Sequence, residues 1–206
     1  MADGSHGTAQ LEESIDRLAA IDWSRSESAH REAARVLEAL DAEALLTELK
    51  VDLEAMVDPG RSSEKTTHYK WLVDDDPGGR FKLWLHEYKP SELRREGHAA
   101  IPHNHRFWLS SVILRGGFTD SRFRRVERPD PQTDWIEPQT SRSMSVGNTM
   151  TLAPEEIHAL GDLRDGTVSL IVEGEAVRSF SEVFEGGTMR RYYDLEAKLA
   201  DFRRSL

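Results

Sequence analysis

The spacing of apolar residues changes near residue 60 and divides the chain into two parts. In the first part, apolar side chains recur every three or four residues over Ala33–Met56, as on one face of an α-helix. This stripe ends at Asp58-Pro59-Gly60, a turn-forming sequence. Ahead of it, Ser24-x-x-Glu27 has the form of a capping box and predicts where the helical segment begins. A shorter helix is predicted over Ala9–Ala20.

After residue 60 the pattern is that of short β-strands. Thr67–Val73 and Arg80–Lys89 are strand-like and flank Asp75-Asp76-Pro77-Gly78-Gly79, whose composition predicts a hairpin loop. Many short strands separated by glycine and proline favour a sandwich or a barrel. The other predicted strands are Ala100–His105, Trp108–Leu114, Phe118–Val126, Ser143–Val146, Thr149–Leu152, Glu156–Leu160, Val168–Glu173 and Ser179–Phe184.

These patterns predict three regions: an N-terminal helical extension over 1–60, a barrel over 61–194 and a short C-terminal helix over 195–206. The N-terminal helices either cover a sheet of the barrel or form a subunit interface. We favour the first, because amphipathic helices usually pack against their own domain. The proline-containing segment Arg128–Thr140 is predicted to be a longer loop at the barrel mouth.

Composition excludes several classes of function. A formal net charge of -10 argues against a nucleic-acid-binding surface. The absence of cysteine excludes disulfides, thiolate metal ligands and a cysteine nucleophile. No apolar stretch approaches the roughly 20 residues of a membrane span, and no signal-peptide core is present. We therefore expect a soluble, cytoplasmic protein with no membrane partner.

Three histidines carry the candidate chemistry: His103 and His105, in Pro102-His103-Asn104-His105, and His158. On a strand, residues i and i+2 point to the same side of the sheet. A third imidazole from another strand would complete a facial triad that binds a divalent metal and leaves positions open for substrate. The alternative is a hydrogen-bonded histidine pair in a barrel without metal.

The residues around these histidines resemble the cupin superfamily. The first cupin motif, G-x5-H-x-H-x(3,4)-E-x6-G, is matched by Gly97, His103, His105 and Gly116-Gly117, but not at its glutamate. The resemblance covers about residues 65–185. It implies a mainly β fold, a cupin jelly roll or double-stranded β-helix, between the two helical segments.

The second cupin motif is roughly G-x5-P-x-G-x2-H-x3-N. Here Gly147 precedes Pro154 with one extra residue, His158 follows, and Asp162 stands where asparagine is usual. The motif's second glycine is replaced by Glu156, and the spacing to the histidine is one residue short. The resemblance implies that His158 is the third metal ligand.

The missing glutamate narrows the resemblance, because Ser110 or Leu109 occupies its position. This implies the three-histidine subset of cupins, as in the thiol dioxygenases. Such a site most readily holds Fe(II), with open positions for a bidentate substrate and O2, and its ligands also suit Zn(II), Ni(II), Mn(II) or Cu(II). The tyrosine and arginine of thiol dioxygenases have no match here, so the resemblance does not extend to cysteine as substrate.

Candidate substrate-binding residues come first from the strand 80–89. One of its faces carries Arg80, His86 and Tyr88, together with Lys82 and Trp84, and could line a polar pocket. The alternative, slightly favoured from sequence, makes this the solvent face and puts the opposite face in the core.

Further candidates follow the histidine pair. Strict alternation turns Phe107 inward as a pocket wall, whereas the cupin spacing turns Ser110 inward and places Trp108 in an outer layer. Arg115, and more distantly Arg122-x-Arg124-Arg125, could bind a carboxylate or phosphate, or form a solvated strand face.

Together these features predict a metal-dependent cupin oxygenase that uses Fe(II) and O2 on a small polar or carboxylate-bearing molecule. The alternative is a non-oxidative cupin, either a metal-dependent isomerase or lyase or a ligand-binding module without catalysis. The helical extension and the barrel edges make a homodimer plausible. The sequence assigns no catalytic residue beyond the metal ligands.

Overall fold

The computed structural model describes residues 9–94, 99–126, 135–186 and 188–192. Three helices come first: α1 (Ala9–Ala19), α2 (Ser26–Glu38) and α3 (Ala42–Met56). The predicted C-terminal helix over 195–206 lies outside the described residues, as do Gly97 and the first part of the predicted loop over 128–140. The strands are β1 (Asp58–Glu64), β2 (His68–Asp75), β3 (Phe81–Tyr88), β4 (Phe107–Arg115), β5 (Gly117–Val126), β6 (Trp135–Ser145), β7 (Thr149–Leu152), β8 (Ile157–Gly161), β9 (Val168–Ala176), β10 (Ser181–Glu185) and β11 (Thr188–Tyr192).

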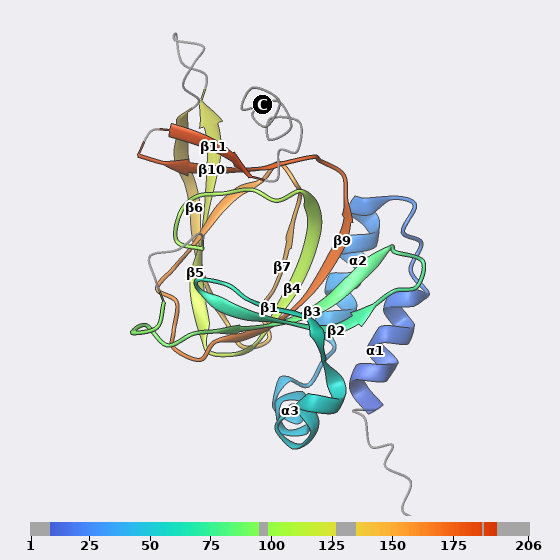
Figure 1. The fold of residues 1–206 in the computed structure, drawn as a ribbon. Helices are drawn as coiled ribbons and strands as arrows, with labels where there is room; N and C mark the ends of the chain where they lie inside the picture. The colour runs from blue at the N-terminus through green and yellow to red at the C-terminus, as the bar shows by residue number, and fades with distance from the viewer. Residues whose placement is uncertain (1–8, 95–98, 127–134, 187, 193–206) are drawn as a thin grey trace, which may run out of the picture.

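The described strands form a six-stranded sheet in the order β1-β2-β3-β9-β4-β7, a three-stranded sheet in the order β6-β5-β8, and the hairpin β10-β11. All pairings between these strands are antiparallel. The two larger sheets curve around a common interior (Figure 1). The fold class is therefore the predicted one: a mainly β jelly-roll barrel of two antiparallel sheets with an N-terminal helical extension.

The helices cover the outer face of the six-stranded sheet (Figure 1). Leu18 of α1 and Leu37 of α2 are fully buried in one apolar cluster with Leu83 of β3 and Leu114 of β4. Burying this apolar surface is the main force that holds the helices to the barrel. The predicted covering role is confirmed. None of the described helices is long and apolar enough to cross a membrane.

Alternation along β3 and β4 determines which side chains enter the barrel. Leu83 and Leu85 pack under the helices, while Trp84 and Tyr88 belong to apolar clusters on the opposite face. Trp84 and Tyr88 are buried, so the interpretation of their face as solvent-exposed is wrong. Both faces of this strand are covered, one by helices and the other by the second sheet.

The helical region departs from prediction at two points. The stripe over 33–56 forms two helices, because Asp41 caps α3 by accepting hydrogen bonds from Glu43 N and Ala44 N. The capping box is not formed. Ser24 N instead bonds to Asp22 Oδ1, and α2 begins one residue later with Arg25 as an N-cap without a side-chain hydrogen bond.

Several strand boundaries also differ. β1 begins at Asp58, within the predicted turn, because Asp58 already pairs with Leu72. A bulge between Asp58 and Ser63 accommodates the turn-forming residues. Ala100–His105 is not a strand, because only His103 makes a bridge. β6 occupies 135–145, including the end of the predicted loop, and the edge strand β11 was not predicted.

Candidate metal centre

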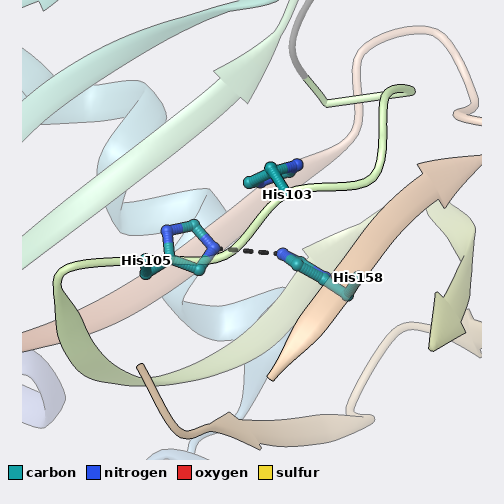
Figure 2. A group of neighbouring side chains, drawn as sticks. All are labelled: His103, His105 and His158. Carbon is teal, nitrogen blue, oxygen red and sulfur yellow. Dashed lines mark hydrogen bonds between the residues drawn. The ribbon is translucent and has the colours of Figure 1, made fainter. Parts of the chain in front are cut away.

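Three imidazoles meet inside the barrel, from two separate parts of the chain. His103 and His105 come from the segment that leads into β4, and His158 comes from β8 (Figure 2). One ligand nitrogen from each ring lies within 4.8 Å of the others, and Nε2 of His105 is 3.1 Å from Nε2 of His158. The ring centroids are 4.8 to 5.2 Å apart. The predicted triad is therefore a real cluster.

A backbone bridge produces this convergence. His103 N donates to His158 O at 2.8 Å, and His158 N donates to His103 O at 2.9 Å. Residues paired in this reciprocal way lie directly opposite each other, with side chains on the same face. His105, two residues further on, turns to the same side. One antiparallel bridge thus replaces the longer strand that the sequence predicts here.

Hydrogen bonds to the second ring nitrogen orient two of the imidazoles. Nδ1 of His103 lies 2.8 Å from Ile101 O, and Nδ1 of His158 lies 2.9 Å from Asp120 Oδ1. Since a carbonyl and a carboxylate can only accept, both Nδ1 atoms donate. In a neutral imidazole this leaves Nε2 with the lone pair. Both rings therefore have the tautomer that a metal-binding Nε2 requires.

Asp120 is buried and is shared between His158 and Arg122, whose Nε lies 2.5 Å from its Oδ2. Burial alone would raise the pKa of Asp120, but the hydrogen bonds from His158 and Arg122 outweigh it and lower that pKa. The carboxylate therefore stays ionised and holds His158 in place. Sequence reasoning missed this role, because it requires β5 to lie beside β8.

Asn104, between the two histidines, is held by Glu182 of β10. Its backbone N donates to Glu182 O, its Nδ2 donates to Glu182 Oε2, and Glu182 N donates to its Oδ1. Arg125 and Arg178 also donate to Glu182 Oε2, so Arg125, a predicted anion-binding candidate, has an internal partner. Burial would raise the pKa of Glu182, but Asn104 and the two arginines lower it.

The donor set fits a divalent ion. Two nitrogens bound at about 2.0–2.2 Å to one ion, at angles between octahedral and tetrahedral, are about 2.8–3.6 Å apart. The 3.1 Å between Nε2 of His105 and His158 lies in this range. Among the described residues, no carboxylate joins the three histidines as a fourth ligand. The site is a three-histidine one.

Three of the predicted substrate residues lie inside the barrel. The Phe107 ring is 5.6 Å from that of His105. His86 stacks on His68 at 4.3 Å, and burial lowers the pKa of His86 well below its ordinary value. Burial likewise raises the pKa of Tyr88 to about 12. His86 and Tyr88 therefore remain neutral near pH 7.

The structure does not bring the other three to the histidines. Ser110 faces the helices and bonds to the carbonyl and Nδ1 of His30, so the inward orientation taken from the cupin spacing is wrong and simple alternation is right. Arg115 is exposed at the far end of β4 and binds Gly166 O. Arg80 is exposed and pairs with Asp76 on the hairpin.

Comparisons with known proteins find distant likenesses to solved structures. No protein-family model matches the chain, and no curated protein matches it in sequence. Similar solved structures include an 11S globulin from Wrightia tinctoria (12% identity over 57% of this chain and 31% of that chain, TM-score 0.37). Another is oxalate decarboxylase from Bacillus subtilis (14% identity over 69% of this chain and 34% of that chain, TM-score 0.38). The alignments thus span about a third of the length of each of these proteins.

Proposed function

We propose that this protein is a metal-dependent cupin enzyme, in which His103, His105 and His158 hold one divalent ion. We further propose Fe(II) as the native ion, O2 as co-substrate and a three-histidine site like that of the thiol dioxygenases. The convergence of the three imidazoles carries the proposal, since two of them are already in the metal-binding tautomer. A bound Fe(II) would supply a Lewis-acidic and redox-active centre with open positions.

The surrounding residues favour a substrate that brings its own negative charge. Three neutral imidazoles leave the full charge of a divalent ion uncompensated. Asp120 lies on the far side of the His158 ring and already pairs with Arg122, so it does not supply that charge directly. A small molecule with a carboxylate or another chelating anion would therefore be held at the open positions.

One wall near the histidines is apolar. Phe107 lies next to His105, and Leu109 follows it on the same face of β4, buried with Leu152 and Ile171. Apolar side chains exclude water and strengthen electrostatic interactions within the site. Such walls suit a reaction with O2, itself a small apolar molecule, and this supports the oxidative over the non-oxidative alternative.

The test is metal-dependent O2 consumption. Protein loaded anaerobically with Fe(II) is mixed with O2 and a panel of amino acids, thiols, and hydroxy and keto acids, with His105→Ala as the inactive comparison. Arg115→Ala, altered far from the cluster, should match the wild type. Substrate-dependent O2 uptake by wild type and Arg115→Ala supports the oxygenase. Iron binding with no uptake for any compound contradicts it and favours the isomerase or lyase.

A further inference from the structure

Two buried polar atoms on β3 lack a hydrogen-bond partner: Nε1 of Trp84 and Nε2 of His86. The Trp84 side chain is well buried, with the residue 8% exposed. Trp84 and His86 are two residues apart, so they lie next to each other on the inner face of the strand. A buried polar group without a partner destabilises the folded protein. Two such atoms side by side indicate a place where a ligand completes the hydrogen bonding.

The chemistry of the two groups restricts what they bind. The indole N–H of Trp84 can only donate, and its partner must therefore be an acceptor. His86 is neutral, and stacking on His68 at 4.3 Å fixes the plane of its ring. Its Nε2 can donate to the same acceptor or accept from a hydroxyl, depending on the tautomer.

The charges nearest the Trp84 ring compensate each other. Lys70 Nζ lies 4.0 Å from the centre of the Trp84 ring and is bound to Glu173 Oε2 at 2.7 Å. Because this ion pair is neutral overall, it would not compensate a second negatively charged group on the ligand. The two orphaned atoms therefore favour an uncharged oxygen, such as a hydroxyl or a carbonyl.

Phe107 connects this place to the metal centre. Its ring lies 5.6 Å from His105 and also packs in the apolar cluster that contains Trp84. An open pocket of about 690 Å³ begins beside it, with Lys82 and Glu173 of the same inner face among its lining residues. Phe107 therefore borders the pocket and also contacts both His105 and the cluster that contains Trp84.

We propose that Trp84 and His86 form a second subsite of the metal centre, which binds an uncharged oxygen of the substrate while an anionic group of the same molecule faces the three histidines. This inference rests on the proposed function. The substrate class is then a small carboxylate, or a similar chelating anion, that carries a hydroxyl or carbonyl group at its other end.

The experiment uses protein loaded with Zn(II), in which the tryptophan indole nitrogens are 15N-labelled. The probes are ω-hydroxy carboxylates of three to six carbons and the matching acids without the hydroxyl, with affinities measured by calorimetry. At one chain length the hydroxy acid should bind about tenfold more tightly than the matching acid without the hydroxyl. This is the effect expected when a buried polar atom without a partner gains a hydrogen bond. The same ligand should shift the Trp84 indole signal.

Variants separate the subsite from general effects. Trp84→Phe should abolish the hydroxyl preference. Trp71→Phe is the matched control and should retain it, because the Trp71 indole already donates to Glu87 Oε2 at 3.3 Å. Equal binding of hydroxylated and plain acids by the wild type, or an unchanged preference in Trp84→Phe, would overturn the subsite.

The outcomes also separate the subsite from the metal centre. If carboxylates bind only when Zn(II) is present and show no preference for a hydroxyl group, the metal centre is supported and the subsite is contradicted. If the protein does not take up Zn(II), the proposed function is contradicted. The Trp84 indole signal still reports whether a hydroxyl group reaches the indole. If Trp84→Phe does not fold, that signal in the wild type decides alone, and an unmoved signal overturns the subsite.

Discussion

Asn104 and Glu182 hold each other through three hydrogen bonds, at 2.7, 2.7 and 3.0 Å, although 78 residues separate them in the sequence. Because Asn104 lies between His103 and His105, this pair fixes the segment that presents both imidazoles. Glu182 in turn receives hydrogen bonds from Arg125 and Arg178. The geometry of the metal centre therefore depends on β10 as well as on the strands that carry the ligands.

Replacing Asn104 by alanine removes two of these bonds and leaves polar atoms of Glu182 with fewer partners. We expect the free energy of unfolding to fall by about 1–3 kcal/mol. The affinity for Zn(II) should weaken by roughly 10–100-fold, as for other outer-shell changes. Denaturant unfolding and a chelator competition measure the two effects. Ser141→Ala, which removes an exposed hydroxyl contact with Ser121, should change neither; an Asn104→Ala variant with unaltered affinity would contradict the anchoring role.

Asp120→Asn tests the orientation of His158. The amide can still meet Nδ1 but no longer favours the metal-binding tautomer through a charge, so Zn(II) affinity should fall by roughly 10–100-fold. Glu156→Gln changes the other partner of Arg122 without touching His158 and should retain wild-type affinity. Equal affinities for the two variants in the same chelator competition would show that Asp120 does not tune the ligand.

The contact between the helices and the barrel should contribute to stability independently of the metal centre. Leu37 is fully buried between α2 and the sheet, so Leu37→Ala should lower the free energy of unfolding by about 2–5 kcal/mol. Leu93, which is 59% exposed, gives a control, and Leu93→Ala should cost less than about 0.5 kcal/mol. Zn(II) stoichiometry should stay unchanged in both. A similar small loss in both variants would mean that the helices contribute little.

His30 should make the metal-free protein less stable in acid. Burial lowers its pKa from 6.5 to about 4, so between these values the unfolded chain binds the proton and the folded protein does not. Its stabilising contribution is therefore complete above pH 6.5 and is lost progressively as the pH falls toward 4.

Denaturant unfolding at several pH values measures this loss. Between pH 6.5 and 4, the free energy of unfolding of His30→Gln should fall by roughly 3 kcal/mol less than that of the wild type. Ser28→Ala, on the same helix, should follow the wild-type pH dependence. If the free energy of unfolding depends on pH in the same way in His30→Gln and in the wild type, His30 is not the source of the acid sensitivity.

The sequence predicts the fold class and the histidine cluster because both depend on local spacing. Two histidines at i and i+2 must share a side, and the cupin motifs add His158 from a second strand. Alternation after His105 also places Phe107 correctly. The cupin spacing misplaces Ser110, because the motif counts residues whereas the strand alternates its side chains strictly.

The remaining features depend on which strands become neighbours. Asp120 reaches His158 only because β5 pairs with β8, and Glu182 reaches Asn104 only because β10 passes beside the histidine segment. No pattern within either segment predicts these contacts. Asp41 is different: an aspartate before a helical stretch is a recognised cap, but the apolar stripe that continues through it favours a single helix.

The metal content of the wild type and of three single variants tests the central claim most directly. Zn(II)-loaded wild type should retain about one ion per chain after gel filtration, as for a single mononuclear site. His103→Ala, His105→Ala and His158→Ala should each lose it while remaining folded by circular dichroism. His30→Gln, altered outside the barrel, should keep it. Normal metal content in His158→Ala, or a wild type that binds no metal, would contradict the three-histidine centre.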